Sequence, residues 1–469
     1  MSRLFGLVLL VNVLSMMACR TTAAPVSDSL GVTFNDEVIR AVGKGEKSLK
    51  LGTGVWLTDG KKNHRMAIAG DRLTISGKGI DSTIIRRPEN SLGTGSGKDF
   101  YFGAFFEPAM PTDAELNSSE WKEWVDKDGS TFLYTVLIKG NLTIENLTID
   151  CNMQAQSIQP GDKVEHSAML GFAGSRELLE GRFAGRRVYV AFENVTVRNV
   201  AIRNEGYADG IWISRGYFQP NIASIHFDKV TTVNRVSTKR GSITFSSPAE
   251  RVEISNCSLH RLELEESTQE NYANAPRHQP ESQLSIWTVY DSEVAILDMA
   301  AKGYSTVIQG ENVQVKENVA LYQMQGQFTH CTFNKVGDPR LFRLKEMIFD
   351  DVTWIFSPDK EGRIRGIRPT PQYGENFTAT FINNKFLAHG TFLKGQLISS
   401  EYSRAIDQKV NVSFIFCDFD DRFGVIPNTI GVSVKERGSW KFEGLDEASV
   451  LRLIRKGPQT DIEVKMVNQ

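Results

Sequence analysis

Three short segments decide the fold: NVTV at residues 194–197, KVTT at 229–232 and NCSL at 256–259. In each, a turn residue is followed by a β-branched or apolar run. The same pattern recurs as NLTI (146–149), HCTF (330–333), DVTW (351–354) and NKFL (384–387). Most of the spacings fit a unit of roughly 20–35 residues with loop insertions, which is typical of solenoid proteins.

A strand-rich unit of this length cannot bury its own apolar face, so successive units must stack on one another. Hairpin signals such as Asn-Gly are absent between the strands, which disfavours a meander or a propeller. Helix patterns appear only near the ends of the chain. We therefore predict an all-β fold, a single-stranded parallel β-helix whose strands stack about 4.8 Å apart.

The β-helix domain is predicted over residues 35–457, with a short helix covering each end. For the first helix, Asn35 is the expected N-cap and Gly43 the expected end, with Val38, Ile39 and Val42 on the apolar side. Such a helix would cover the open edge of the strand stack.

For the second helix, Val450, Leu451 and Ile454 have the spacing of one helical face. Residues 458–469 are then a C-terminal tail. Two insertions, at 107–130 and 153–187, interrupt the early repeats.

Composition and charge limit the classes of function. The chain has 469 residues and a net charge of −2, from 54 basic and 56 acidic side chains. A dedicated nucleic-acid-binding protein would show a basic excess, so we expect no nucleic-acid partner. A local basic groove for an anionic polymer remains compatible with this balance.

The N-terminus resembles a targeting segment. Arg3 is followed by an apolar run from Leu4 to Leu14, which is too short to span a bilayer well. Ala18 before Cys19 resembles a bacterial lipobox, although Met16 stands where Leu is usual. We predict a signal peptide over residues 1–19, lipidation of Cys19 and a tether over residues 20–34. Ordinary signal cleavage near residues 21–23 is the alternative.

This prediction places the protein outside the cytoplasm, either secreted or held at the membrane by its N-terminal lipid. Arg20 offers no aspartate retention signal for the inner membrane. An outer-membrane destination is therefore favoured if the host is Gram-negative.

Four further cysteines lie in the mature chain: Cys151, Cys257, Cys331 and Cys417. None forms a C-x-x-C pair, which argues against a structural zinc site. We expect small buried core residues, and pairing between stacked turns stays open as an alternative.

Two early segments carry a family resemblance: LGTGVWLT at 51–58 and LTISGKGIDSTII at 73–85. With the terminal helical cover, they resemble the start of proteins in the pectate-lyase-like right-handed parallel β-helix superfamily. The resemblance covers roughly residues 45–440. It implies charged and aromatic side chains on one outward strand face, in the middle of the stack, acting on a polysaccharide. The vWiDH and RxPxxR signatures of extracellular pectate lyases are absent, so no specific family is assigned.

Matched polar positions define the candidate site. Aligning ADGIWIS (208–214) with KRGSITFSS (239–247) places Gly210 on Gly241, and Asp209 beside Arg240 on the next coil. Because side chains alternate between strand faces, we expect both charged groups to point outward.

A uronate lyase needs a cation to neutralise the sugar carboxylate and a base to remove the neighbouring proton. The residues near the ladder supply both kinds of group. We assign catalytic roles to Asp209, Lys239, Arg240 and His260. We assign substrate contacts to Arg203, Glu205, Tyr207 and Trp212, and a calcium site to Glu205 and Asp209.

Four alternatives stay open. Asp209 and Arg240 can be a surface ion pair worth roughly 0–1 kcal/mol, and Trp212 can be a packing residue. The protein can be a non-catalytic, glycan-binding or structural protein of the cell envelope. A glycoside hydrolase would need two carboxylates on either side of the bond, and Glu205 with Asp209 are the candidates.

Overall fold

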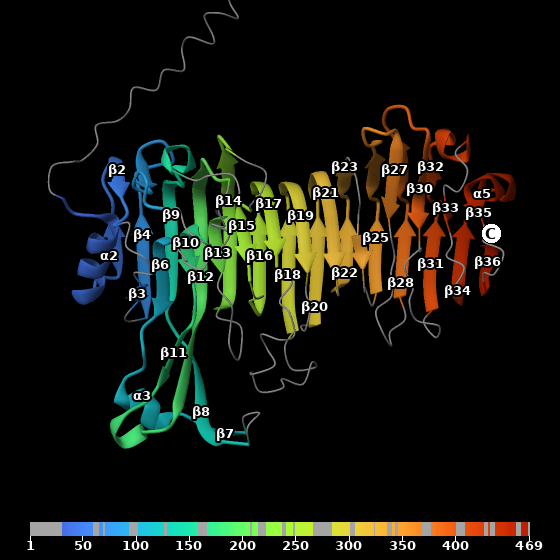
Figure 1. Cartoon of the computed structure of the whole chain (residues 1–469). Coiled ribbons are helices and arrows are strands. Elements are labelled where there is room, and N and C mark those ends of the chain that lie inside the picture. Colours follow the sequence, from blue (N-terminus) through green and yellow to red (C-terminus); the bar gives the residue numbers. More distant parts are fainter. Residues whose placement is uncertain are drawn as a thin grey trace, which may run out of the picture.

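The structure is a computed structural model of the whole chain (Figure 1). It describes residues 31–59, 65–68, 71–92, 102–125, 129–157, 167–206, 209–213, 222–236, 241–246, 249–265, 284–300, 305–322, 324–334, 340–342, 346–367, 377–399, 409–425, 430–431, 437–455 and 461–467.

The chain coils into a long rod of parallel strands, which confirms the predicted all-β parallel β-helix (Figure 1). Each coil contributes strands to up to three parallel rows. The first row contains β1 (Ser48–Lys50), β4 (Arg72–Ser76), β9 (Asn141–Asp150), β12 (Arg187–Arg203), β14 (Ile222–Val233), β16 (Arg251–Ser255), β18 (Leu284–Tyr290), β20 (Ser305–Glu311), β22 (Met324–Thr329), β25 (Glu346–Asp350), β28 (Phe377–Ile382), β31 (Lys409–Ile415), β34 (Arg437–Glu443) and β36 (Asp461–Val467).

In each coil, the strand of the second row follows the turn after the strand of the first row. β9, β12 and β14 run through this turn, so their last residues belong to the second row. Its other members are β2 (Gly54–Leu57), β5 (Thr83–Arg86), β17 (Ser258–Leu264), β19 (Glu293–Ala300), β21 (Gln314–Tyr322), β23 (Thr332–Asn334), β26 (Thr353–Phe356), β29 (Lys385–Ala388) and β32 (Asp418–Phe419).

The third row begins with β3 (Arg65–Ile68), β6 (Phe102–Pro108), β10 (Ala168–Phe172), β13 (Asp209–Ile213) and β15 (Ile243–Phe245). It continues through the ends of β17, β19 and β21 to β24 (Arg340–Phe342). A separate parallel sheet holds β27 (Arg363–Ile367), β30 (Lys394–Ser399), β33 (Ile430–Gly431) and β35 (Ile454–Arg455).

A column of left-handed turn residues separates the first two rows. Non-glycine residues with φ between 47° and 57° occupy equivalent places in ten coils: Asn146, Asn199, Lys229, Asn256, Asp291, Asn312, His330, Asp351, Asn383 and Phe416. Asn and Asp tolerate this conformation best because their short side chains hydrogen-bond locally. Members of the column also contact each other between stacked coils: the side-chain amide of Asn199 donates to Asn146 Oδ1 at 2.8 Å.

The predicted repeat therefore marks real turns at Asn146, Lys229, Asn256, His330 and Asp351. Two predicted turn positions are wrong. Asn194 lies within β12 and pairs with Ser224, and the turn residue of that coil is Asn199. Asn384 is displaced by one residue from the turn at Asn383 and is buried.

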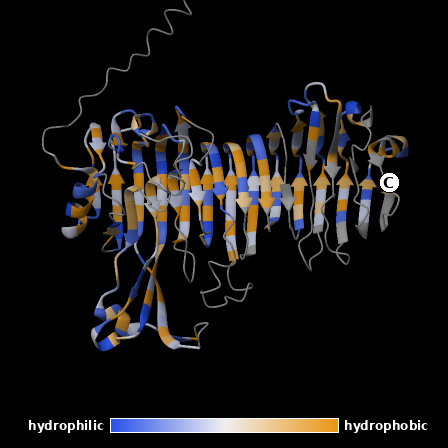
Figure 2. Cartoon of the chain, viewed as in Figure 1, coloured by the Kyte–Doolittle hydropathy of each residue, from blue (hydrophilic) through white to orange (hydrophobic). Residues whose placement is uncertain are grey.

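The interior is one continuous apolar core along the rod. Like side chains stack in ladders because the parallel register brings equivalent positions together. Phe349, Phe381, Phe414 and Phe442 form such a stack, with ring centroids 5.2, 5.1 and 5.0 Å apart. Alternation of apolar and polar residues along the strands is visible in Figure 2.

The cysteines are part of this interior. Cys151, Cys257, Cys331 and Cys417 are all free and buried, which confirms the expected core role. Cys257 Sγ donates to the carbonyl of Ser255 at 3.1 Å. Burial raises the pKa of Cys257 to about 12.

A helix covers the N-terminal end, as predicted. This helix is α2 (Phe34–Gly43), and its N-cap is Thr33, which forms a capping box with Asp36. Asn35, the expected N-cap, instead lies buried inside the helix and donates to the carbonyl of Gly103 at 3.2 Å. Phe34 and Val38 face the core, whereas Ile39 is exposed.

At the other end, α5 (Glu447–Leu453) packs beside η4 (Asp421–Val425). Val450 and Leu453 are buried, and Leu451, expected on the buried face, is exposed. The expected tail contains β36, which pairs with β34. None of the helices in the described residues is long and apolar enough to cross a lipid bilayer.

The two predicted insertions meet in an arm that projects from the rod near its N-terminal end (Figure 1). The arm comprises α3 (Asp113–Ser118), β7 (Lys122–Val125), β8 (Thr131–Ile138), β11 (Ser175–Leu178), η2 (Gly181–Phe183) and the first residues of β12. Its β7–β8 and β11–β12 pairs are antiparallel, which the sequence patterns did not predict. A further short turn of helix is η1 (Met153–Ala155).

Candidate functional site on the first row of strands

The residues selected from the sequence do not form an exposed site. Glu205, Asp209, Trp212 and His260 are all buried, and Arg203 is largely buried. Tyr207, Lys239 and Arg240 lie outside the described residues, as does Cys19. The prediction that Asp209 points outward is therefore wrong, and its contact with Arg240 stays a prediction.

The predicted register is also wrong by one residue. Ile211 pairs with Ile243, so the offset between these coils is 32 residues (243 − 211) rather than 31. This register places Ile211 and Ile213 beside Ile243 and Phe245, and all four side chains belong to the main core. The buried apolar side chains set the register here, and the glycines do not, because a one-residue slip would turn these side chains out of the core.

Glu205 and Asp209 lie in a buried polar corner next to the core. Ser242 Oγ donates to Glu205 Oε1 at 3.0 Å, and Thr244 Oγ1 donates to Asp209 Oδ1 at 2.9 Å. Burial raises the pKa of Glu205 to about 8, although Ser242 and Arg235 favour the charged form. A neutral, protonated Glu205 is therefore expected near pH 7.

The other selected residues have structural contacts. Trp212 belongs to a small apolar cluster, stacks on Phe102 at 5.3 Å and donates to Ser246 Oγ at 2.8 Å. Its ring is not presented to solvent as a platform for sugar. His260 contacts Arg235, and its backbone N–H donates to Ser242 Oγ at 3.0 Å. Arg203 contacts Asp81 at 3.4 Å.

The described residues do not fit the calcium site considered for Glu205 and Asp209. Calcium takes about six to eight oxygen ligands, with carboxylates charged. Glu205 has a raised pKa, and both carboxyl groups accept hydrogen bonds from Ser242 and Thr244. Within the described part of the chain, no group of three or more His, Cys, Asp and Glu side chains is placed to hold a metal ion.

A different set of polar residues lies on the outward side of the first row, in the middle of the rod. In each coil there, the outward positions alternate with core positions up to a left-handed turn residue. The parallel register aligns these positions into adjoining lines. One line holds His226, Glu253, Thr288, Gln309 and Gln327, and the next holds Asp228, Ser255, Tyr290, Glu311 and Thr329.

Hydrogen bonds join the side chains of three successive coils in this region. Tyr290 Oη donates to Glu253 Oε1 at 2.6 Å, and Glu253 lies 3.5 Å from His226 Nε2. His226 Nε2 also lies 3.1 Å from Ser255 Oγ, which donates to Asp228 Oδ1 at 3.1 Å. The contact with the Glu253 carboxylate raises the pKa of Tyr290. We call His226, Glu253, Ser255, Asp228 and Tyr290 the lateral network.

A shallow hollow of about 240 Å³ adjoins the lateral network. Tyr290 belongs to both and forms one side of the hollow. The other outward lining residues are polar: Thr288, Gln309, Glu311, Gln327 and Thr329. Hydroxyl, amide and carboxylate groups around one aromatic ring are suited to the hydroxyl groups of a saccharide. An acid–base network beside such a hollow can move protons on a bound chain.

The sequence contains a signal for this site that the glycine alignment missed. In each coil, the outward residues lie one and three positions before the turn residue. This holds in the segments ASIHFDK, RVEISN, TVYD and VIQGEN. These positions are polar or aromatic in four successive coils. The turn residues, and not the glycines, mark equivalent positions in successive coils.

Comparisons with known proteins add a similarity in overall shape. No protein-family model matches the sequence, and no curated protein matches it. Among solved structures, tailspike protein 3 of bacteriophage CBA120 is similar, with 10% sequence identity and a TM-score of 0.38. The match covers 93% of this chain and 59% of the tailspike chain, so this chain spans less than two thirds of that protein. The fold assignment rests on the strand pairing, and membership of the pectate-lyase-like superfamily stays a prediction.

Proposed function

We propose that this protein binds a polysaccharide along the first row of strands and acts on it through the lateral network. The observation that carries the proposal is Glu253 on an exposed strand face beside a polar hollow, with Tyr290 hydrogen-bonded to it and His226 Nε2 at 3.5 Å from it. A parallel β-helix presents such positions in straight lines, which suits an extended polymer. Three coils supply the network, so a bound chain would cross several coils.

The chemistry that this arrangement favours is β-elimination on a uronate-containing chain. His226 would remove the proton next to the sugar carboxylate. The electron pair would form a C4–C5 double bond as the C4–O bond breaks, and Tyr290 would donate its proton to the leaving oxygen. Arg251 occupies the outward position of β16 two residues before Glu253, where it can neutralise the sugar carboxylate.

A second chemistry is favoured by the carboxylates on the same face. Asp228 and Glu253 occupy outward positions of the neighbouring strands β14 and β16, and Glu311 occupies one on β20, two strands further along the row. Hydrolysis of a glycosidic bond uses two carboxyl groups, one as acid and one as base or nucleophile. The products separate the two reactions, because elimination leaves an unsaturated sugar that absorbs ultraviolet light and hydrolysis does not.

A polysaccharide panel tests the proposal directly. Polygalacturonate, alginate, hyaluronan and neutral dextran are incubated with the protein, and ultraviolet absorbance is measured alongside reducing ends. Glu253→Gln and Tyr290→Phe should each lower the rate about 100-fold, the usual range for loss of a general acid–base group. Glu293→Gln, on the second row and paired with Lys316, is the matched control.

The outcomes separate binding from catalysis. Unsaturated product that disappears in Glu253→Gln supports the lyase, and reducing ends without unsaturated product support the hydrolase. Binding without any product leaves a non-catalytic glycan-binding protein. Equal loss in Glu293→Gln, or neither binding nor product with any of the polymers, would overturn the proposal.

We also propose that Cys19 carries a lipid that holds the domain outside the cytoplasm, at the outer membrane in a Gram-negative host. The support is the apolar run that ends at Ala18 and Cys19. Cys19→Ser should move the protein out of the membrane fraction. Unchanged fractionation would show that lipidation is not the anchor.

A further inference from the structure

The arm is a four-stranded sheet with two unlike faces. Its strands lie in the order β7, β8, β12 and β11. One face packs against the rest of the arm, where Leu116 of α3, Phe183, Val188 and Val190 form a separate apolar cluster. Strand alternation places the side chains between these positions on the opposite face. We call this opposite side the outer arm face.

Aromatic rings line the outer arm face from one strand to the next. Trp124 lies 6.2 Å from Phe132 and 6.3 Å from Tyr134, measured between ring centroids. Tyr134 is followed by Tyr189 at 6.4 Å. All four rings are partly exposed. Aromatic side chains in such a line present flat apolar surface with a polar edge, which suits a ligand that has both apolar faces and hydrogen-bonding groups.

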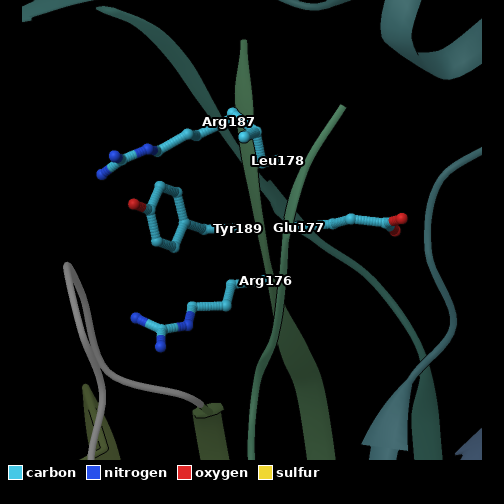
Figure 3. Close-up of a pocket in the computed structure, with 5 residues that line it drawn as sticks. All are labelled: Arg176, Glu177, Leu178, Arg187 and Tyr189. Carbon is cyan, nitrogen blue, oxygen red and sulfur yellow. The ribbon is translucent and has the colours of Figure 1, made fainter. Parts of the chain in front are cut away.

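A hollow of about 320 Å³ lies at the β11–β12 side of this face, as Figure 3 shows. Arg176, Tyr189 and Arg187 point to the same side, with the tyrosine ring between the two guanidinium groups (Figure 3). Glu177, from the same strand as Arg176, points away from them (Figure 3). The Arg187 guanidinium carbon lies 3.9 Å from the centroid of the Phe132 ring, which holds this cation in place.

The outer arm face is positively charged although the whole chain is slightly acidic. Its outward strand positions include Lys122, Arg176 and Arg187. One carboxylate, that of Glu177, adjoins the hollow, but its side chain points away from the two guanidinium groups (Figure 3). Two guanidinium groups on either side of an aromatic ring match a chain in which rings alternate with carboxylates, because arginine binds carboxylates in a two-pronged geometry.

We propose that the outer arm face is a second binding site, for an acidic polysaccharide, with Arg187 and Arg176 on the carboxylates and Tyr189 against a sugar ring. The inference rests on the proposed function only for the class of polymer. The hollow favours a chain-like ligand over a flat lipid surface, because a pocket of this size encloses part of a small ligand. Three cations are also too few for a dedicated nucleic-acid site.

The test measures affinity rather than turnover. Binding of the purified protein to polygalacturonate, alginate, hyaluronan and neutral dextran is measured by calorimetry at low and high salt. Arg187→Gln should weaken binding of the acidic polymer about 10- to 100-fold, the loss of one charge-assisted contact. Arg176→Gln, on the edge strand, should do the same and keeps the test valid if Arg187→Gln disturbs the arm. Arg182→Gln removes the same charge from the other side of the arm, beside Phe183, and is the matched control.

The results for these variants support or overturn the binding site. Weaker binding in Arg187→Gln and Arg176→Gln but not in Arg182→Gln, with loss of binding at high salt, supports the site. The proposal would be overturned if all three variants bound the acidic polymer as tightly as the parent, or if dextran bound as tightly as the acidic polymers. Binding to phosphatidylglycerol vesicles without binding of any acidic polymer would also overturn it. Glu293→Gln, which lies outside both the outer arm face and the lateral network, should leave this affinity unchanged. Product formation is measured separately and reports on the lateral network, so failure of the arm site and failure of the lateral network are distinguishable.

Discussion

Replacing Glu205 by Gln should remove a pH dependence from the stability of the β-helix. The Glu205 side chain is fully buried, and Ser242 donates its hydroxyl hydrogen to it. Burial raises the pKa of this carboxyl group from 4.5 to about 8. The folded chain therefore holds the proton over a pH range in which the unfolded chain has lost it.

The sign follows from proton binding. Between pH 4.5 and pH 8 the folded state binds more protons than the unfolded state, so the free energy of unfolding falls as pH rises. The shift of 3.5 units (8 − 4.5) corresponds to at most about 5 kcal/mol, at 1.36 kcal/mol per unit. Local opening of the corner limits the loss, because Glu205 can then ionise in water without unfolding of the whole rod.

Thermal unfolding of the parent and of Glu205→Gln, followed by circular dichroism across this pH range, measures the effect. The two proteins should unfold at similar temperatures near pH 4.5, and the variant should be the more stable one near pH 8. The neutral amide keeps the shape of the protonated acid and still accepts from Ser242. Parallel pH profiles for the two proteins would refute a buried, protonated Glu205.

Three other predictions concern single residues. Lys139 and the Thr112 cap lower the pKa of Glu115 to about 2. Glu115→Gln should therefore lower the free energy of unfolding by up to about 1 kcal/mol at neutral pH, and this difference should fade as pH falls from 4.5 toward 2. A difference in urea midpoint that does not depend on pH would contradict this. Lys229→Asn should raise the unfolding free energy by about 1 kcal/mol, because Asn tolerates the φ of 53° better than Lys; an unchanged or lower melting temperature would count against turn strain. Cys257, Cys331 and Cys417 should resist iodoacetamide in the native protein and react after unfolding, and mass spectrometry showing rapid native alkylation would contradict their burial.

The repeat predicts the fold well because one turn conformation is used in most coils. Asn, Asp and His leave a visible trace at Asn146, Asn256, His330 and Asp351. Phe416 adopts the same conformation without such a trace, so its coil was not marked. The sequence predicts the arm only as two insertions, because its strands pair across the segment between them and pairing of this kind has no local sequence signal.

The candidate site was predicted less well for a related reason. An error of one residue exchanges buried and outward positions, and the glycine alignment contained that error. Glu205 and Asp209 look like surface acids in the sequence, and only the stacked coils show that they are enclosed. His226, Glu253 and Tyr290 are separated by 27 and 37 residues (253 − 226 and 290 − 253), so their contact depends on coil lengths that vary.

Strand β12 has a mechanical consequence. Its 17 residues run without interruption from the arm sheet, where Val188 pairs with Thr135, into the rod, where Val195 pairs with Ile225. A continuous strand bonded on both sides leaves no hinge at the base of the arm. A force on the arm would act directly on the backbone of the rod, in shear across the hydrogen bonds of β12 with β9 and β14. The arm and the rod should therefore move as one rigid body when a bound polymer is under tension.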